Sequence, residues 1–314
     1  MKRSNQIPEM RHLPFSVIAA IRDLLANKEA NKKLKENYFK DRLTIIAAIP
    51  KSASSVIGSC VAEILSMVSK KSRSYAKYML ANRDSDLRPE LVKDFPKGGV
   101  LKFHTRATGK NLKVLELLGV KYIILLRHPA DQIVALYCNI CDYLISAEEH
   151  EKNGWVKTNV YPVPGWVFRN GVDINESLQC LIREGYLNAT LSWMVDWLRF
   201  RNAERSLILK YEDFVLKTEE TLNVMSNFLV GFPVSQDCAK KCNVIVKGAK
   251  KHTENNSSNS TKYPRGWTGK IGIWKNYFSD TNKNDYRSTV KDFLDYYPNA
   301  SLLQEVYTDL MDID

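Results

Sequence analysis

The amino-acid sequence predicts an α/β fold with a mostly parallel central sheet flanked by helices. Three short apolar runs, at 44–49, 122–126 and 206–210, have the length and composition of buried strands. A segment with helical features follows each run, and strands that alternate with helices are typical of a parallel sheet. The chain has 314 residues, of which 44% are hydrophobic, and we expect a single domain over 1–314.

The helices expected after these strands have recognisable first or last residues. Residues 54–69 form the first helix, and Pro129 suits the first turn of the second because no N–H is needed there. Thr218 is expected to cap the third helix, whose first turn carries two glutamates that favour the positive end of the helix dipole. Gly231 is expected to end it. Ligands bind where the strands of such sheets end, so functional residues should follow each strand.

Two segments depart from this alternation. Residues 146–200 begin with a stretch rich in Gly, Pro, Trp and charge, and we expect them to form a lid over a substrate site. Residues 252–264 are polar and low in complexity, which predicts a mobile loop. The expected lid contains these aromatic residues that would line a pocket: Trp155, Tyr161, Trp166, Phe168, Trp193 and Trp197.

The formal net charge of +11 indicates an anionic partner. The basic residues are spread along the chain, without a Lys/Arg tract interleaved with aromatics, so we expect a small anionic ligand and no nucleic acid. No run approaches the roughly 20 apolar residues that span a membrane. Apolar residues at helical spacing over 17–25 predict an amphipathic helix, with a signal peptide as the alternative. A cytoplasmic protein is expected.

The six cysteines do not resemble a disulfide framework in a chain of this size, so we expect buried, reduced thiols. Cys138 and Cys141 have C-x-x-C spacing, and Cys238 and Cys242 are four positions apart. A zinc site built from both pairs is the alternative. We favour thiols and expect no metal, because each pair lies in a segment that reads as helix.

A phosphate-binding loop is predicted directly after the first strand, where residues 50–55 read Pro-Lys-Ser-Ala-Ser-Ser. Small residues let the backbone aim its N–H groups at one point, and the helix that follows favours an anion at its amino end. Lys51 adds a full charge, and the serines add hydroxyl donors. An ordinary strand-to-helix turn is the alternative. A Walker A loop is excluded because its lysine comes late in the motif.

This loop resembles the PKSGTTW loop of PAPS-dependent sulfotransferases of the soluble type, which holds the 5′-phosphosulfate end of the donor. The match implies donor contacts for six consecutive residues: Lys51, Ser52, Ala53, Ser54, Ser55 and Val56. Serines replace two threonines, Ala53 replaces the glycine, and Val56 replaces a tryptophan that stacks on adenine in many members.

Two further family motifs follow in order. The K-T-H motif is matched by Lys102-Phe103-His104, which implies that His104 is the general base and that Lys102 assists it. The R-x-P/A-x-D-x-x-x-S motif starts at Arg127, which would hold the donor's 3′-phosphate. Ala135 stands where the family has a serine at the same phosphate.

The last two motifs complete the resemblance. Tyr211 and the two acids after it match a YED motif whose tyrosine lies near the adenine, and we expect those acids to cap the next element. The R-K-G-x-x-G-D-W-K-N motif is matched at its glycines, including Gly269, and at its W-K-N triplet over 274–276. Arg265 is the candidate for the missing guanidinium, and Lys270 is a second candidate to supply the positive charge.

The resemblance implies transfer of a sulfuryl group from PAPS to a hydroxyl or amine of a small molecule, with PAP as the product. The catalytic residues would be Lys51, His104 and Lys102. A phenol or an alkaloid is the favoured acceptor, and a homodimer is compatible with the sequence. The alternatives are a P-loop kinase or other phosphotransferase and a catalytically decayed PAP-binding protein.

Overall fold

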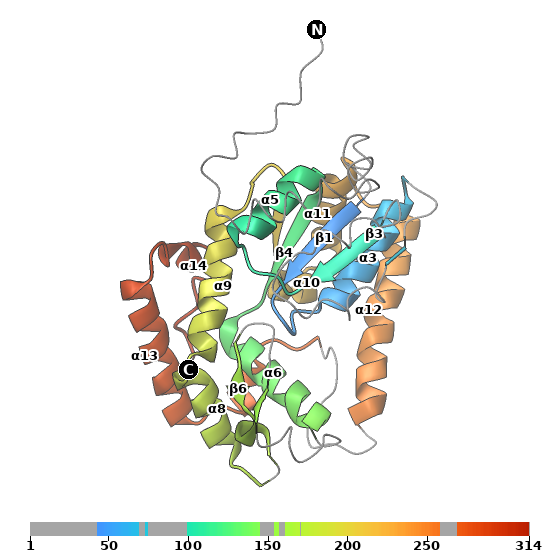
Figure 1. The fold of residues 1–314 in the computed structure, drawn as a ribbon. Coiled ribbons are helices and arrows are strands. Elements are labelled where there is room, and N and C mark those ends of the chain that lie inside the picture. The colour runs from blue at the N-terminus through green and yellow to red at the C-terminus, as the bar shows by residue number, and fades with distance from the viewer. Residues whose placement is uncertain are drawn as a thin grey trace.

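The structure is a computed structural model that describes residues 43–68, 73–74, 99–144, 154–156, 161–169, 171–257 and 269–313. Its centre is a five-stranded parallel sheet with the order β2-β3-β1-β4-β7 (Figure 1). The strands are β1 (Leu43–Ala48), β2 (Arg73–Ser74), β3 (Gly99–Phe103), β4 (Lys121–Leu126) and β7 (Ser206–Lys210). The predicted fold class and all three predicted strands are therefore confirmed.

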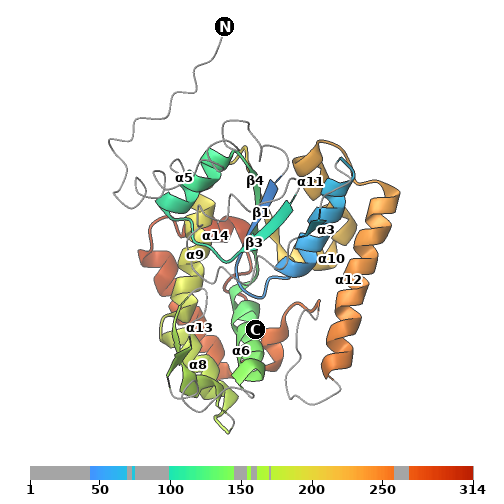
Figure 2. The ribbon, with the colours of Figure 1, turned by 45° about the vertical axis from the view of Figure 1, so that its right-hand side comes forward.

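Helices cover both faces of the sheet, as Figures 1 and 2 show for α3 and α12 on one side and α5 and α9 on the other. The first face carries α3 (Ser54–Ser66), α10 (Tyr211–Leu216), α11 (Thr218–Val230) and α12 (Gln236–Ser257). The second carries α5 (Gly109–Leu118), α6 (Pro129–Leu144), α8 (Ile174–Arg183), α9 (Tyr186–Phe200), α13 (Asp280–Tyr296) and α14 (Ser301–Val306).

Strand β1 divides the core in two because its side chains alternate between the faces. Ile45 and Ala47 pack with α5, α6 and α9, whereas Ile46 and Ala48 pack with α3, α11 and α12. Both faces are apolar, so the strand reads as one continuous hydrophobic run.

The smaller elements lie beyond the sheet. A short antiparallel ribbon pairs β5 (Trp155–Val156) with β6 (Val163–Pro164) and leads into the 3-10 helix η3 (Gly165–Phe168). A second 3-10 helix, η4 (Ile273–Asn276), packs against α6. No helix in the described parts of the chain is both long and apolar enough to pass through a lipid bilayer.

The predicted helix ends are partly confirmed. Pro129 is the first residue of α6, and Gly231 ends α11 in a left-handed conformation with φ of 86°. The prediction that Thr218 caps α11 is wrong, because Lys217 occupies the cap position. Only one residue separates α10 from α11, and the Thr218 hydroxyl donates back to the Phe214 carbonyl at 2.8 Å.

The two irregular segments need larger corrections. Residues 174–200, expected within a lid, form α8 and α9, whose apolar stripes are buried in the core. The expected loop at 252–264 is helical as far as Ser257, because a helix once started gains one hydrogen bond per added residue and no proline interrupts α12. Residues 258–264 and the predicted helix at 17–25 lie outside the described residues.

All six cysteines are buried free thiols, as predicted. The pair Cys138 and Cys141 packs on one face of the sheet, and the pair Cys238 and Cys242 packs on the other. The sheet therefore separates the two pairs that the zinc alternative would have joined. Within the described ranges, no three His, Cys, Asp or Glu side chains gather closely enough to hold a metal ion.

Candidate active site

The carboxyl ends of four parallel strands bring the predicted site residues to one edge of the sheet. Lys51 follows β1, His104 follows β3, Arg127 follows β4 and Tyr211 begins α10 directly after β7. Strand β1 lies at the centre, with β3 on one side and β4 on the other, and such a switch in strand order opens a crevice for a ligand.

The loop after β1 has the backbone of an anion cradle. Lys51 and Ala53 both adopt left-handed conformations, with φ of 68° and 61°, which L-residues rarely adopt. No side chain caps the start of α3, so its first backbone N–H groups and the positive end of its dipole face the loop. The buried Ser52 hydroxyl donates to the Ile49 carbonyl at 2.6 Å and thereby closes the turn. This arrangement fits a phosphate.

The residues beside Lys51 differ in burial and in contacts. The Lys102 ammonium donates to the Ser55 hydroxyl at 2.9 Å, and burial lowers the pKa of this lysine. Ser54 is buried at the start of α3, and Val56 packs into the core beneath that helix. Lys51 and Ser55 of the loop and Lys102 of β3 are therefore the charged and polar side chains at this point.

His104 is held as a neutral base. Its Nδ1 lies 2.8 Å from the Ala48 carbonyl, and because a carbonyl only accepts, Nδ1 carries the proton and Nε2 is the basic nitrogen. Burial is the main cause that lowers the pKa of His104 to about 4; the charges of Lys102 and Lys51 act in the same direction, and the Ala48 bond opposes them.

The backbone after His104 is fixed by two tryptophans of α9. The indole N–H groups of Trp193 and Trp197 donate to the same carbonyl, that of Thr105, at 2.8 and 3.0 Å. The Thr105 hydroxyl accepts from Asn111 Nδ2 at 2.6 Å. These tryptophans, expected to line a pocket, are almost completely buried and instead hold the segment that carries the histidine.

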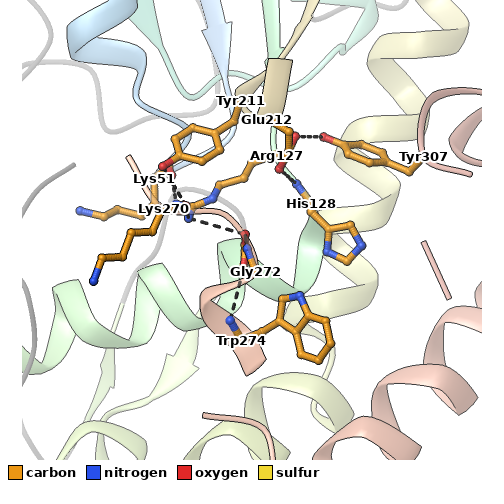
Figure 3. Close-up of polar contacts among 10 residues, drawn as sticks. Lys51, Arg127, His128, Tyr211, Glu212, Lys270, Gly272, Trp274 and Tyr307 are labelled. Carbon is orange, nitrogen blue, oxygen red and sulfur yellow. Dashed lines mark hydrogen bonds and ion pairs between the residues drawn. The ribbon is translucent and has the colours of Figure 1, made fainter. Parts of the chain in front are cut away.

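Arg127 joins the phosphate loop to the segment at 269–276 (Figure 3). Its guanidinium donates to the Lys51 carbonyl at 2.7 Å and to the Lys270 carbonyl at 3.4 Å. It lies 4.1 Å above the Tyr211 ring, whose hydroxyl also donates to the Lys270 carbonyl, at 3.1 Å. Arg127 Nε is buried and has no hydrogen-bond partner in the described parts of the chain. A buried, incompletely paired guanidinium suits an anionic ligand.

Asp131, the acid of the R-x-P/A-x-D motif, fixes the turn that reaches this guanidinium, a role that the sequence analysis did not assign to it. Its carboxylate accepts from the backbone N–H groups of Gly272, at 2.7 Å, and Trp274, at 3.2 Å. It also lies 4.0 Å from the Arg127 guanidinium. The available signal was an acid four residues after Arg127 in the first turn of a helix.

Glu212 supports the same region from behind. Its carboxylate accepts from the His128 backbone N–H at 2.8 Å and from the Tyr307 hydroxyl at 3.3 Å. Burial raises the pKa of Glu212. The prediction that this acid caps the next element is wrong, because Lys210 occupies the cap position of α10 and no described side chain caps it. The contacts of Glu212 instead tie α10 to the residue after Arg127 and to the C-terminal part of the chain.

The remaining predicted residues are distributed as follows. Gly269 has a left-handed φ of 65° and precedes Lys270, whose side chain is exposed. Ala135 is partly buried on α6 and offers no polar group, whereas Asn139, one turn later, accepts from the Lys51 ammonium. Arg265 lies outside the described residues.

Comparison with known proteins identifies the family and the fold. A family model described as "Sulfotransferase domain" matches residues 17–298. The mouse sulfotransferase SULT7A1 complexed with PAP is similar in structure, with a TM-score of 0.55 and 16% identity over 90% of this chain and 95% of that one. Retinol dehydratase in complex with androsterone and inactive cofactor PAP has a TM-score of 0.57 and 14% identity, over 92% of this chain and 98% of that one. The same enzyme in a complex with retinol and PAP has a TM-score of 0.56 and 14% identity, over 91% of this chain and 97% of that one. No curated protein matches the chain in sequence.

Proposed function

The chain belongs to the sulfotransferase domain family, and from that premise we propose that it transfers a sulfuryl group from PAPS to a small-molecule acceptor. The observation that carries the proposal is the meeting of a phosphate loop, two lysines and a neutral histidine at one edge of the sheet. The structural neighbours named above bind PAP, which supports PAPS as the donor.

The residues at this edge divide between the two ends of the donor. Lys51, the loop that follows it and the first turn of α3 would bind the 5′-phosphate. Arg127, the backbone of Gly269 and the exposed ammonium of Lys270 would bind the 3′-phosphate, and Tyr211 would lie near the adenine. The buried Nε of Arg127 is the observation that fits this group best. When bound, PAPS supplies a sulfuryl group on a phosphate that leaves readily.

The chain's own side chains then move one proton and stabilise one charge. His104 Nε2 takes the proton of the acceptor hydroxyl as the acceptor oxygen bonds to sulfur. The bond between sulfur and the phosphate oxygen breaks, and its electron pair stays on that oxygen in PAP. Lys51 stabilises the charge that grows there, a contact that strengthens toward the transition state. Lys102 assists from the Ser55 side of the loop.

Among acceptors we favour a phenol. A phenol ionises at about pH 10, as tyrosine does, far more readily than an aliphatic alcohol, and this suits a base whose pKa is lowered to about 4. The charges of Lys51 and Lys102 beside His104 would stabilise a phenolate. The same two charges would repel a protonated alkaloid, so the electrostatics of the site favour a phenol over an alkaloid.

A cytoplasmic location goes with this proposal. It is supported by the six cysteines, all of which are free thiols, because disulfides are rare in reducing compartments.

The test compares Lys51→Met with Lys247→Met, which changes an exposed lysine of α12. Transfer from PAPS to a panel of phenols is measured as PAP release. Lys51→Met should lower kcat by about 100-fold to 1,000-fold, as losing one transition-state donor does, and Lys247→Met should behave as wild type. Equal turnover in both variants would contradict the assignment. PAP binding by wild type without turnover on any acceptor would favour the decayed binding protein.

A further inference from the structure

The Lys51 side chain has a specific partner outside every motif used so far. Its ammonium donates to Asn139 Oδ1 at 2.6 Å, across 88 positions of sequence. Asn139 belongs to α6, the helix that begins two residues after Arg127, and its side chain is exposed. Core packing therefore does not explain the residue, and the contact with Lys51 is its evident interaction.

The backbone and the side chain of Lys51 are controlled separately. Arg127 donates to the Lys51 carbonyl at 2.7 Å and fixes the left-handed backbone. The side chain is a flexible stem, so the place of its ammonium depends on hydrogen-bond partners. Lys102 brings a second ammonium to the same loop, where it donates to the Ser55 hydroxyl at 2.9 Å. The two ammonium groups have different acceptors, Asn139 for Lys51 and Ser55 for Lys102.

An amide at position 139 is better suited to hold the Lys51 ammonium than a carboxylate or a methyl group would be. The amide oxygen accepts from the ammonium without neutralising it, so the cation stays available to an anion. A carboxylate would form a charge-assisted pair that competes with a phosphate more strongly. Ala135, one turn earlier on α6, offers no acceptor.

We propose that Asn139 is a positioning residue that holds the Lys51 ammonium beside the loop until an anionic nucleotide draws it away. The inference rests on the proposed function, because it treats Lys51 as a ligand of the donor. The nucleotide must break the Lys51–Asn139 bond to recruit the ammonium. The affinity for PAP should therefore follow the residue at 139 in the order alanine, then asparagine, then aspartate.

Calorimetric titration with PAP tests this order in the full chain. Asn139→Ala should bind PAP about threefold to tenfold more tightly than wild type, as removal of one competing hydrogen bond predicts. Asn139→Asp should bind about tenfold more weakly or worse, because a charged pair must be broken. Asn227→Ala, at an exposed position of α11, is the matched control and should leave the affinity unchanged.

A second measurement needs no nucleotide. Pulse acylation of the nucleotide-free protein, read by peptide mass spectrometry, reports how freely the Lys51 amine reacts. Lys51 should react faster in Asn139→Ala and more slowly in Asn139→Asp than in wild type, with no change in Asn227→Ala. If Asn139 had only a structural role, its variants would change the midpoint of thermal unfolding but would not produce this order of Lys51 acylation rates.

The outcomes separate the two proposals. If wild type binds PAP but Asn139→Ala binds it within twofold of wild type, the role of Asn139 is overturned and the proposed function stands. If wild type does not bind PAP, both are overturned. Acylation rates at Lys51 that ignore residue 139 would also overturn the positioning role.

Discussion

Replacing His104 by glutamine should remove a pH-dependent loss of stability. The imidazole pKa is lowered from 6.5 to about 4 in the folded chain, mainly by burial. The folded state therefore favours the neutral ring, while the unfolded chain takes up a proton near pH 6.5. The stability that this neutral ring contributes is fully present above pH 6.5 and is lost as pH falls toward 4. Glutamine can still donate to the Ala48 carbonyl but has no proton to gain.

The size of the effect follows from the two pKa values. At pH 5 the unfolded histidine is almost fully protonated and the folded one is about one-tenth protonated, which amounts to about 2 kcal/mol of unfolding free energy. Between pH 5 and pH 4 the unfolding free energy falls by about 1 kcal/mol more. The ring keeps some solvent contact, so these values are upper limits.

Urea unfolding of wild type and His104→Gln at pH 7.5, 6.0 and 5.0 measures this difference. The remaining titratable groups are common to both proteins, so they cancel in the comparison. The variant should gain about 2 kcal/mol relative to wild type between the highest and lowest pH. A difference that stays constant with pH would refute the lowered pKa and, with it, the neutral base.

Three further predictions concern the base, the Asp131 turn and two glycines. The value of kcat/KM should stay level from pH 7 down to about 5, because His104 remains neutral there; an inflection near 6.5 would contradict this. Asp131→Asn should weaken PAP binding about tenfold, because one acceptor is lost on the Gly272–Trp274 turn; unchanged affinity in calorimetry would show that the turn does not serve the nucleotide. Gly231→Ala should destabilise by about 1 kcal/mol because φ is 86°, whereas Gly248→Ala, in the middle of α12 with open space around it, should stabilise by a similar amount. Thermal unfolding that moves both glycine variants in the same direction would contradict the backbone argument.

The sheet and the meeting of the motif residues at one of its edges were predictable because both depend on local sequence pattern. Each buried strand is a short apolar run, and a parallel sheet places the residues after its strands at one edge. Lys51, Arg127 and Tyr211 come together for that reason. The residues of three motifs therefore meet at the edge of the sheet where we propose the site.

The supporting residues were not predictable because their partners are remote in sequence. Asp131 was visible as a helix-start acid, but its bonds to the 272–274 turn span about 140 positions. Asn139 carries no local signal at all. Trp193 and Trp197 read as pocket aromatics, and only the fold shows that both indoles share the Thr105 carbonyl.

The bridging role of Arg127 has a consequence for folding. Its bonds to the Lys51 and Lys270 carbonyls close loops of 76 and 143 positions, and contacts of such high sequence separation form slowly. The anion cradle can be complete only after the chain beyond residue 270 has docked on β4 and α6. PAP binding would then report completion of the whole fold, and the nucleotide would act as a late-stage ligand that selects fully assembled chains.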